Sequence, residues 1–272
     1  MIRIRVAAVF LSLILFSSLV RAQEAEYETL ENISYYKASD IKDNYQESQC
    51  KLDIYYPKNK KNYVTVVWLH GGGLTEGNKH IPEELKNKGV AIVPIGYRLS
   101  PKVKHPAYIE DSATGVAWVK DSISKYGGDP NKVIVAGHSA GGYLALMLAL
   151  DKSYLKKHNV DADNIMMYFP LSGQCTTHYT VRKEMNLPQD KWWIDEYSPI
   201  FHIRSNTAPI VLTTGGRHEE MALRYEENLI LKKNAERFKN DNVKLYELQG
   251  FDHGTMVNPG LQLLLNLLKG KI

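Results

Sequence analysis

The chain has 272 residues and a formal net charge of +4 at pH 7. Three arginines lie in the first 22 residues, and removing them from the 34 lysines and arginines leaves 31 against 30 aspartates and glutamates. A chain this close to neutral gives no electrostatic reason to expect a nucleic acid or an anionic membrane as a partner.

The N-terminus has the pattern of a secretory signal peptide. Residues 6–20 are an apolar run of 15 preceded by two arginines, and Val20 and Ala22 fit a small-residue cleavage site. The run is shorter than the ~20 apolar residues of a membrane span. We therefore expect residues 1–22 to be removed, leaving a secreted or periplasmic protein with no membrane attachment. A retained signal anchor is the alternative.

Short apolar runs alternate with helical segments along the rest of the chain. Two early antiparallel strands are expected, near residue 35 and at 49–57. Continuous apolar runs, typical of strands buried in a parallel sheet, follow at 63–70, 90–99, 132–137, 164–173, 208–216 and 243–250. Helical patterns occupy 83–89, 109–127, 141–157, 225–240 and 261–270. The alternation predicts an α/β fold of three layers, with a mostly parallel central sheet flanked by helices, formed by residues 23–272 as a single domain.

One stretch, 173–207, has no clear periodicity and contains Trp192 and Trp193. It is either a cap or lid over the site or an irregular excursion between strands. The two tryptophans would then either bind substrate, by stacking on a sugar ring or an aromatic acyl group, or fill the core beneath the loop.

The strongest chemical signal is GHSAGG at 137–142, which contains G-x-S-x-G between a predicted strand and a predicted helix. This is the context that a nucleophile elbow requires. Ser139 would occupy a sharp, strained turn, and the small residues two positions away would let the strand and the helix approach each other. The sequence therefore predicts Ser139 as a nucleophile.

A second motif, HGGG at 70–73, follows the strand expected at 63–70. Consecutive glycines expose backbone N–H groups that can donate to an oxyanion. The motif lacks the G-K-[ST] ending of a phosphate-binding loop, which disfavours that alternative.

His253 lies in GFDHG at 250–254, directly after the last predicted strand. A histidine there can reach across the sheet edge to a nucleophile and act as the general base. The acid should follow the strand at 208–216, where there is no Asp but Glu219 and Glu220 are adjacent. We favour Glu219, with Glu220 as the alternative.

Cys50 and Cys175 are the only cysteines, and their spacing neither proves nor excludes a disulfide. Neither lies in a metal-ligand spacing, so no metal site is expected. The predicted chemistry needs no cofactor, and the sequence gives no oligomeric state.

These motifs, taken in order, resemble the α/β-hydrolase superfamily, and within it the group of hormone-sensitive-lipase-like and feruloyl or acetyl esterase-like carboxylesterases. The resemblance covers about residues 49–270 and rests on HGGG (70–73), YRLSP (97–101), a P-x-x-x-x-D region ending at Asp111, GGDP (127–130) and GHSAGG (137–142).

The resemblance implies an acyl-enzyme mechanism in which Ser139 attacks an ester carbonyl, His253 takes its proton and Glu219 orients the imidazole. The family usually has Asp where this chain has Glu219, which leaves the identity of the acid open. The resemblance also implies an oxyanion hole, formed by the N–H groups of Gly72, Gly73 and Ala140. Tyr97, Arg98 and Asp111 are expected to be scaffold residues near the site.

We therefore expect a serine esterase, with a small-molecule or oligosaccharide ester as substrate and acetyl or feruloyl as the acyl group. Export and the aromatic residues of 173–207 favour a carbohydrate-linked ester. The first alternative is an amide hydrolase like the kynurenine formamidases, in which Glu follows the same strand. The second is a non-catalytic binding module on a hydrolase scaffold.

Overall fold

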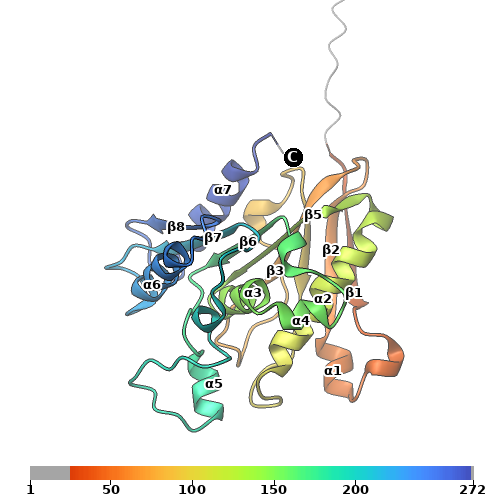
Figure 1. The fold of residues 1–272 in the computed structure, drawn as a ribbon. Helices are drawn as coiled ribbons and strands as arrows, with labels where there is room; N and C mark the ends of the chain where they lie inside the picture. Colours follow the sequence, from red (N-terminus) through yellow and green to blue (C-terminus); the bar gives the residue numbers. More distant parts are fainter. Residues whose placement is uncertain (1–24, 271–272) are drawn as a thin grey trace, which may run out of the picture.

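The computed structural model describes residues 25–270, and its strands form one eight-stranded sheet (Figure 1). The predicted signal peptide lies outside the described residues. The sheet order is β1-β2-β4-β3-β5-β6-β7-β8. The strands are β1 (Tyr27–Ser34), β2 (Lys51–Pro57), β3 (Tyr63–Leu69), β4 (Ala91–Ile95), β5 (Gly128–His138), β6 (Met167–Leu171), β7 (Ile210–Gly215) and β8 (Val243–Leu248).

The sheet is mostly parallel, as the alternation of apolar runs predicted. β1 pairs antiparallel with β2, and β2 pairs antiparallel with β4. All other pairs are parallel, and every residue of the central strand β3 is buried. Parallel neighbours bring their carboxyl ends to one edge, so the loops that follow β3, β5, β7 and β8 meet there.

Helices cover both faces of the sheet, which confirms the three-layer α/β architecture. One apolar core joins the sheet to α2 (Ala107–Ser122), α3 (Ala140–Leu150) and α6 (Arg224–Arg237). A second core on the other face joins it to α7 (Val257–Leu267) and the 3-10 turn η2 (Glu83–Leu85). The shorter elements are η1 (Ala38–Asp40), α1 (Asn44–Gln49), η3 (Ile123–Tyr126), α4 (Lys152–Lys156), η4 (Ala162–Asn164), α5 (Tyr179–Glu184) and η5 (Pro199–His202).

Two predicted elements differ from the structure. The strand expected near residue 35 ends at Ser34, because the Tyr35 side chain turns inward and its hydroxyl donates to Gly96 O at 2.8 Å. The helix expected at 83–89 is only the turn η2. Asn87 there has a φ of 59°, which ends helical geometry, and the segment is too short to offset the cost of helix nucleation.

The stretch 173–207 connects β6 to β7 and contains α5 and η5, and Figure 1 shows α5 away from the body of the sheet. Several hydrogen bonds attach it to the rest of the chain, and three of them reach the HGGG loop, the segment before α2, and α3. Thr180 Oγ1 donates to Gly73 O at 2.5 Å, and Glu184 Oε2 lies 2.8 Å from His105 Nδ1. Tyr143 Oη, on α3, donates to Tyr197 O at 2.9 Å. The excursion is therefore held against the HGGG loop and α3.

Cys50 and Cys175 are both buried and do not form a disulfide. Burial, together with the nearby Asp111 carboxylate, raises the pKa of the Cys50 thiol to about 12. Burial also raises the pKa of the Cys175 thiol well above its ordinary value, so neither thiol is a reactive thiolate in the folded protein.

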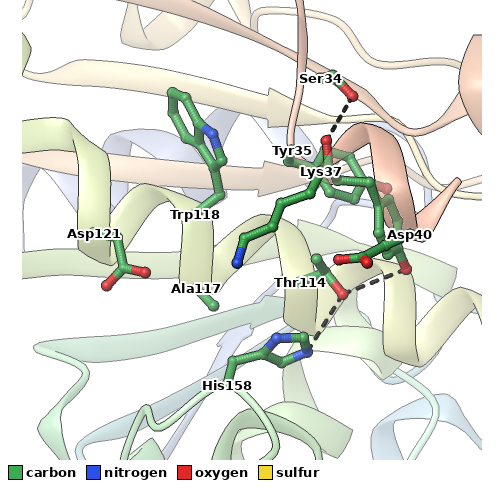
Figure 2. Close-up of a pocket in the computed structure, with 10 residues that line it drawn as sticks. Ser34, Tyr35, Lys37, Asp40, Thr114, Ala117, Trp118, Asp121 and His158 are labelled. Atoms are coloured by element: carbon green, nitrogen blue, oxygen red, sulfur yellow. Dashed lines mark hydrogen bonds between the residues drawn. The ribbon is translucent and has the colours of Figure 1, made fainter.

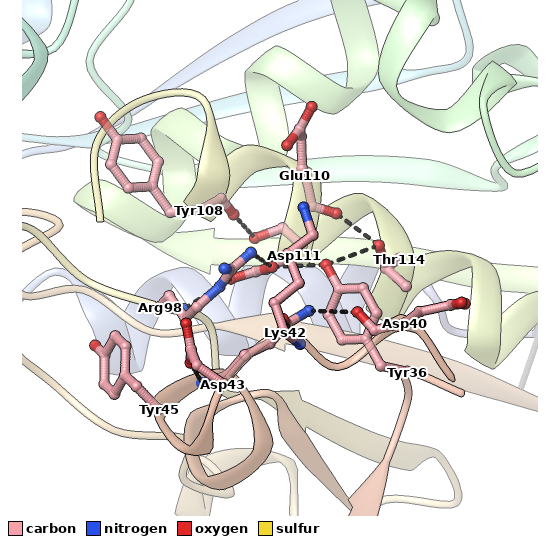
Figure 3. A network of polar contacts seen from close by, with 12 residues as sticks. Tyr36, Asp40, Lys42, Asp43, Tyr45, Arg98, Tyr108, Glu110, Asp111 and Thr114 are labelled. Carbon is pink, nitrogen blue, oxygen red and sulfur yellow. Dashed lines mark hydrogen bonds and ion pairs between the residues drawn. The ribbon is translucent and has the colours of Figure 1, made fainter. Parts of the chain in front are cut away.

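A buried ion pair anchors the YRLSP segment to α2 (Figure 3). Arg98 Nε and Nη2 donate to the two carboxylate oxygens of Asp111 at 2.8 and 2.7 Å, and Tyr36 Oη donates to Asp111 Oδ1 at 2.7 Å. The Asp111 side chain is fully buried. The scaffold role predicted for Arg98 and Asp111 agrees with this bidentate geometry.

Removing one partner of that ion pair should destabilise the fold strongly. Asp111→Ala leaves the largely buried Arg98 guanidinium without a carboxylate, and loss of one partner of a buried pair typically costs about 3–5 kcal/mol of unfolding free energy. Urea denaturation measures the change. Lys58→Ala is the control, because Lys58 pairs with Glu26 at the exposed surface and should not change the midpoint measurably. Equal midpoints for Asp111→Ala and the wild-type protein would show that the pair does not stabilise the fold.

Candidate active site

Ser139 lies in a strained turn between β5 and α3. Its φ of 55° and ψ of −114° are rarely adopted by a residue with a side chain. The backbones crowd around it: a Cβ on Gly137 would lie 2.5 Å from Gly141 O, and one on Gly141 would lie 1.9 Å from Leu69 O. The G-x-S-x-G spacing is thus required by sterics, and it leaves the Ser139 side chain at the sheet edge.

His253, in the loop after β8, lies beside this serine. Its Nε2 is 2.9 Å from Ser139 Oγ, and its Nδ1 is 2.7 Å from Glu220 Oε1. The three residues follow β5, β8 and β7, so the parallel sheet brings them together from distant points in the sequence.

The structure places Glu220, and not the predicted Glu219, against the imidazole. The N–H groups of both residues bond to Gly216 O, at 3.0 Å for Glu219 and 2.8 Å for Glu220, in one tight turn after β7. This turn points the Glu220 side chain inward, where it is fully buried. It leaves Glu219 exposed, with Oε2 folded back over Gly216. The assignment of Glu219 is corrected to Glu220.

Glu220 is held as a carboxylate. Burial by itself raises its pKa, but hydrogen bonds from His253, from Met221 N at 2.8 Å and from Gly215 N at 3.0 Å outweigh burial and lower the pKa to about 2. An ionised carboxylate can only accept hydrogen bonds, so His253 carries its proton on Nδ1. Nε2 is then free to accept the proton of Ser139.

Two further side chains position His253, and neither role was predicted from the sequence. His138 Nε2 donates to the backbone carbonyl of His253 at 2.8 Å, and burial followed by the neighbouring His253 lowers the pKa of His138 to about 4, so His138 is neutral. Ser172 Oγ lies 2.9 Å from His253 Nδ1. His138 is the first x of G-x-S-x-G, a position that the motif leaves open. Ser172, which directly follows β6, lies in no recognised motif.

The HGGG loop lies next to the serine, since a Cβ on Gly71 would be 3.5 Å from Ser139 Cβ. Gly72 and Gly73 have φ values of 108° and 61°, which favour glycine. Within residues 25–270, the N–H groups of Gly72, Gly73 and Ala140 donate no hydrogen bond to the protein. They are therefore available to an oxyanion, as the predicted hole requires.

Tyr97 supports the HGGG loop through its contacts with His70. Its ring stacks on His70 with centroids 4.3 Å apart, and its hydroxyl donates to His70 O at 2.7 Å. Burial lowers the pKa of His70 to about 4, so this histidine is neutral and supports the loop structurally.

The excursion 173–207 forms one wall beside the site. The Tyr179 hydroxyl lies over Gly73, where it would be 1.8 Å from an added Cβ. Tyr179 and Trp192 line a cavity of about 210 Å³ together with Met221, the residue that follows Glu220. Trp193 does not line it, and its backbone oxygen accepts from Thr177 N at 2.9 Å. The structure thus brings Trp192, but not Trp193, to a cavity near the triad.

Another cavity, of about 450 Å³, lies against α2 and is lined by residues such as Lys37, Trp118 and His158 (Figure 2). No residue of the predicted site lines this cavity. Among residues 25–270, no group of three or more His, Cys, Asp or Glu side chains is arranged to hold a metal ion. In the same part of the chain, no helix is long and apolar enough to cross a bilayer.

Known proteins resemble this chain in sequence over about a third of its length. Carboxylesterase NlhH of Mycobacterium tuberculosis is 36% identical over 102 residues, which are 35% of this chain and 32% of the relative. Fumonisin B1 esterase of Sphingopyxis macrogoltabida is 34% identical over 111 residues, or 33% of this chain and 21% of the relative. The chain therefore spans about a third or less of the length of these relatives.

Solved structures resemble it over almost the whole chain. A truncated carbohydrate esterase from gut microbiota superposes with a TM-score of 0.72 at 19% identity, covering 92% of this chain and 98% of that one. Esterase B of Lactobacillus rhamnosis has a TM-score of 0.70 at 18% identity, covering 90% of this chain and 84% of its own. At these identities the likeness shows the fold, which is that of the α/β-hydrolases.

A family model described as BD-FAE matches residues 52–235, a span that contains the HGGG loop, the serine turn and Glu220. The match covers more than half of the chain. The chain thus belongs to the BD-FAE family of α/β-hydrolases.

Proposed function

We propose that this protein is a serine esterase that hydrolyses carboxylic esters through an acyl-enzyme. The observation that carries the proposal is the pair of contacts at His253, 2.9 Å to Ser139 Oγ and 2.7 Å to Glu220 Oε1. The chain order, with the serine first, the acid second and the histidine last, is that of α/β-hydrolase triads. Relatives named carboxylesterase and fumonisin B1 esterase support the same reaction class.

In the first half-reaction Ser139 Oγ attacks the ester carbonyl as its proton moves to His253 Nε2. The Glu220 carboxylate stabilises the imidazolium that forms. The negative charge on the carbonyl oxygen is bound by the N–H groups of Gly72, Gly73 and Ala140. His253 then gives the proton to the departing alcohol, which leaves an acyl group on Ser139.

In the second half-reaction the roles reverse. Water attacks the acyl-enzyme while His253 Nε2 takes one of its protons, and the proton then returns to Ser139 Oγ as the carboxylic acid leaves. Ser172, beside His253 Nδ1, helps to hold the ring in the same orientation through both steps.

The natural substrate we propose is a carbohydrate carrying small acyl groups such as acetyl or feruloyl, hydrolysed outside the cytoplasm after removal of residues 1–22. Trp192, exposed at the cavity beside the triad, gives a flat apolar surface for a sugar or aromatic ring. The structural likeness to a carbohydrate esterase is in accord with this substrate.

Two alternatives make different predictions. A non-catalytic binding module has no need of an imidazole within hydrogen-bond reach of both Ser139 and a buried carboxylate. An amide hydrolase like the kynurenine formamidases would use the same triad, so comparing N-formylkynurenine with an acetyl ester distinguishes it from an esterase.

Ser139→Ala should abolish esterase turnover. Loss of the nucleophile is expected to lower kcat for 4-nitrophenyl acetate by on the order of 10⁶-fold, since Ser139 and His253 act as a unit. A fluorophosphonate probe followed by mass spectrometry should label wild-type Ser139. Ser205→Ala, at an exposed serine, is the control and should behave as the wild type. Labelling at another serine, or full activity of Ser139→Ala, would contradict the proposal.

The adjacent glutamates provide a matched pair of variants. Glu220→Gln should lower kcat by roughly 10⁴-fold, because a neutral amide no longer fixes the Nδ1–H tautomer or stabilises the imidazolium. Glu219→Gln, one residue away and exposed, should keep wild-type kcat. Steady-state kinetics with 4-nitrophenyl acetate separates the two, and the opposite ranking would restore Glu219 as the acid.

The lowered pKa of Glu220 predicts that the stability of the fold depends on pH in the acid range. The pKa of Glu220 is lowered from 4.5 to about 2, so its interactions stabilise the fold above pH 4.5 and are lost as the pH falls toward 2. Across this interval the Tm of Glu220→Gln should fall less steeply than that of the wild type. Thermal unfolding at several pH values tests this, and Glu219→Gln should keep the wild-type slope. Parallel curves for all three proteins would rule out a lowered Glu220 pKa.

A further inference from the structure

Two arginines near the triad are buried without a carboxylate partner. Arg182, on α5, is 8% exposed, and Arg224, at the start of α6, is 6% exposed. Within residues 25–270, no Asp or Glu oxygen forms an ion pair with either guanidinium, whereas Arg98 and Arg217 each pair with one. A buried, unpaired cation is costly, and in most proteins a buried guanidinium is paired with a carboxylate.

The contacts that these guanidiniums do make are with backbone carbonyls. Arg224 Nη1 donates to Ser172 O, while Arg182 Nη1 donates to Lys191 O and, at 3.4 Å, to Gln189 O. Arg182 Nε is buried with no acceptor in the described part of the chain. Carbonyl dipoles hold the guanidiniums in place, but they do not cancel the positive charge.

The charge is also felt by a neighbouring buried side chain. Burial first, and then the Arg224 and Arg182 charges, lower the pKa of His178 well below its ordinary value. His178 therefore stays neutral and adds no further positive charge.

Both arginines line the cavity of about 210 Å³ beside the triad. Its other charged lining residues are Lys191, Asp190 and Glu227, so three cations face two carboxylates and the net formal charge is +1. Glu227 is already engaged, since Oε2 accepts from Cys175 N and Oε1 from Thr176 Oγ1, each at 2.9 Å. The cavity thus has two fixed guanidiniums and an uncompensated positive charge.

Three contacts connect this cavity to the reacting groups. Met221, on its wall, directly follows Glu220. Arg224 binds the carbonyl of Ser172, whose hydroxyl lies 2.9 Å from His253 Nδ1. Tyr179, which also lines the cavity, places its hydroxyl over Gly73. The cavity is therefore lined by residues that adjoin or contact the groups around Ser139 and His253.

We propose that this cavity is a carboxylate subsite, and that the protein prefers esters that carry a carboxylate away from the scissile bond. Arg182 and Arg224 would bind the anion, because a planar guanidinium matches a carboxylate in geometry and charge. The volume equals that of roughly seven waters at ~30 Å³ each, which suits a carboxylate on a short chain or on one sugar ring. The inference rests on the proposed esterase function and narrows its substrate class.

The carboxylate has two chemical sources, and two substrate pairs distinguish them. Monoethyl succinate against ethyl 4-methylpentanoate places the anion, or its neutral isostere, on the acyl side. Acetylated methyl glucuronoside against acetylated methyl glucoside places it on the alcohol side. Each hydrolysis is followed in a pH-stat, and kcat/KM for the anionic ester is divided by that for the neutral one.

The wild type should prefer the carboxylate ester of one pair by about ten- to hundredfold, as expected for charge-assisted hydrogen bonds. Arg182→Gln and Arg224→Gln should each remove most of that preference, and Arg182→Lys should keep part of it. Arg217→Gln is the matched control, because Arg217 is an exposed arginine near the acid loop that already pairs with Glu247. It should leave the ratio unchanged. Wild-type ratios near one for both pairs would overturn the proposal, as would an unchanged ratio in Arg182→Gln.

Binding to Ser139→Ala separates failure of the subsite from failure of the esterase. Calorimetry with the same two pairs should show tighter binding of one anionic ester, and the preference should be lost on adding Arg182→Gln. That result with no turnover of any ester by the wild type would refute the esterase and support the subsite. Turnover of the neutral esters with no preference for the anionic ones would support the esterase and refute the subsite. The absence of both turnover and binding would refute both proposals.

Discussion

The close approach of backbones around Ser139 is the constraint on which the rest of the site depends. The turn holds φ at 55°, and the end of β5 and the start of α3 meet with no room for a Cβ at Gly137 or Gly141. Ser139 N also donates to Leu171 O at 2.8 Å, which ties the turn to the neighbouring strand β6. The surrounding sheet and the buried helix α3 over-determine this strained geometry. Every other functional group is positioned relative to it.

Loops from neighbouring strands then reach Ser139 through a small number of polar contacts. Tyr97 fixes the backbone of the HGGG loop, and the Arg98–Asp111 pair fixes the segment that carries Tyr97. On the other side, His138 holds the carbonyl of His253. Because these supports are buried and neutral or paired, they give the loops one conformation without adding a competing charge beside the imidazole.

Much of this arrangement could be predicted from the sequence, because strong local signals coincide with the ends of apolar runs. Ser139, His253 and the HGGG loop follow β5, β8 and β3 directly, and parallel pairing brings such positions together. The choice between Glu219 and Glu220 could not be made this way, since it depends on how one tight turn directs two consecutive side chains. The roles of Ser172 and His138 depend on contacts between residues 81 and 115 positions apart.

In the fold, too, local sequence patterns could be predicted, whereas features that depend on packing between distant residues could not. Runs buried on both faces were recognisable as strands, whereas the helix expected at 83–89 competes with a left-handed Asn87 and is lost. The buried, unpaired state of Arg182 and Arg224 is invisible in the sequence, where they are two of 34 basic residues. Only packing shows that neither guanidinium has a carboxylate partner within residues 25–270.

The position of the excursion 173–207 has an evolutionary consequence. It leaves at the end of β6 and returns at the start of β7, so its length and composition can change without altering the register of the sheet or the strands that carry Ser139, Glu220 and His253. The hydrogen bonds that attach it limit that freedom, and among them Thr180 Oγ1 donates to Gly73 O in the loop beside the nucleophile. Descendants of this scaffold could thus acquire new substrates by exchanging a single insert, provided that each insert keeps a hydrogen-bond donor for that carbonyl.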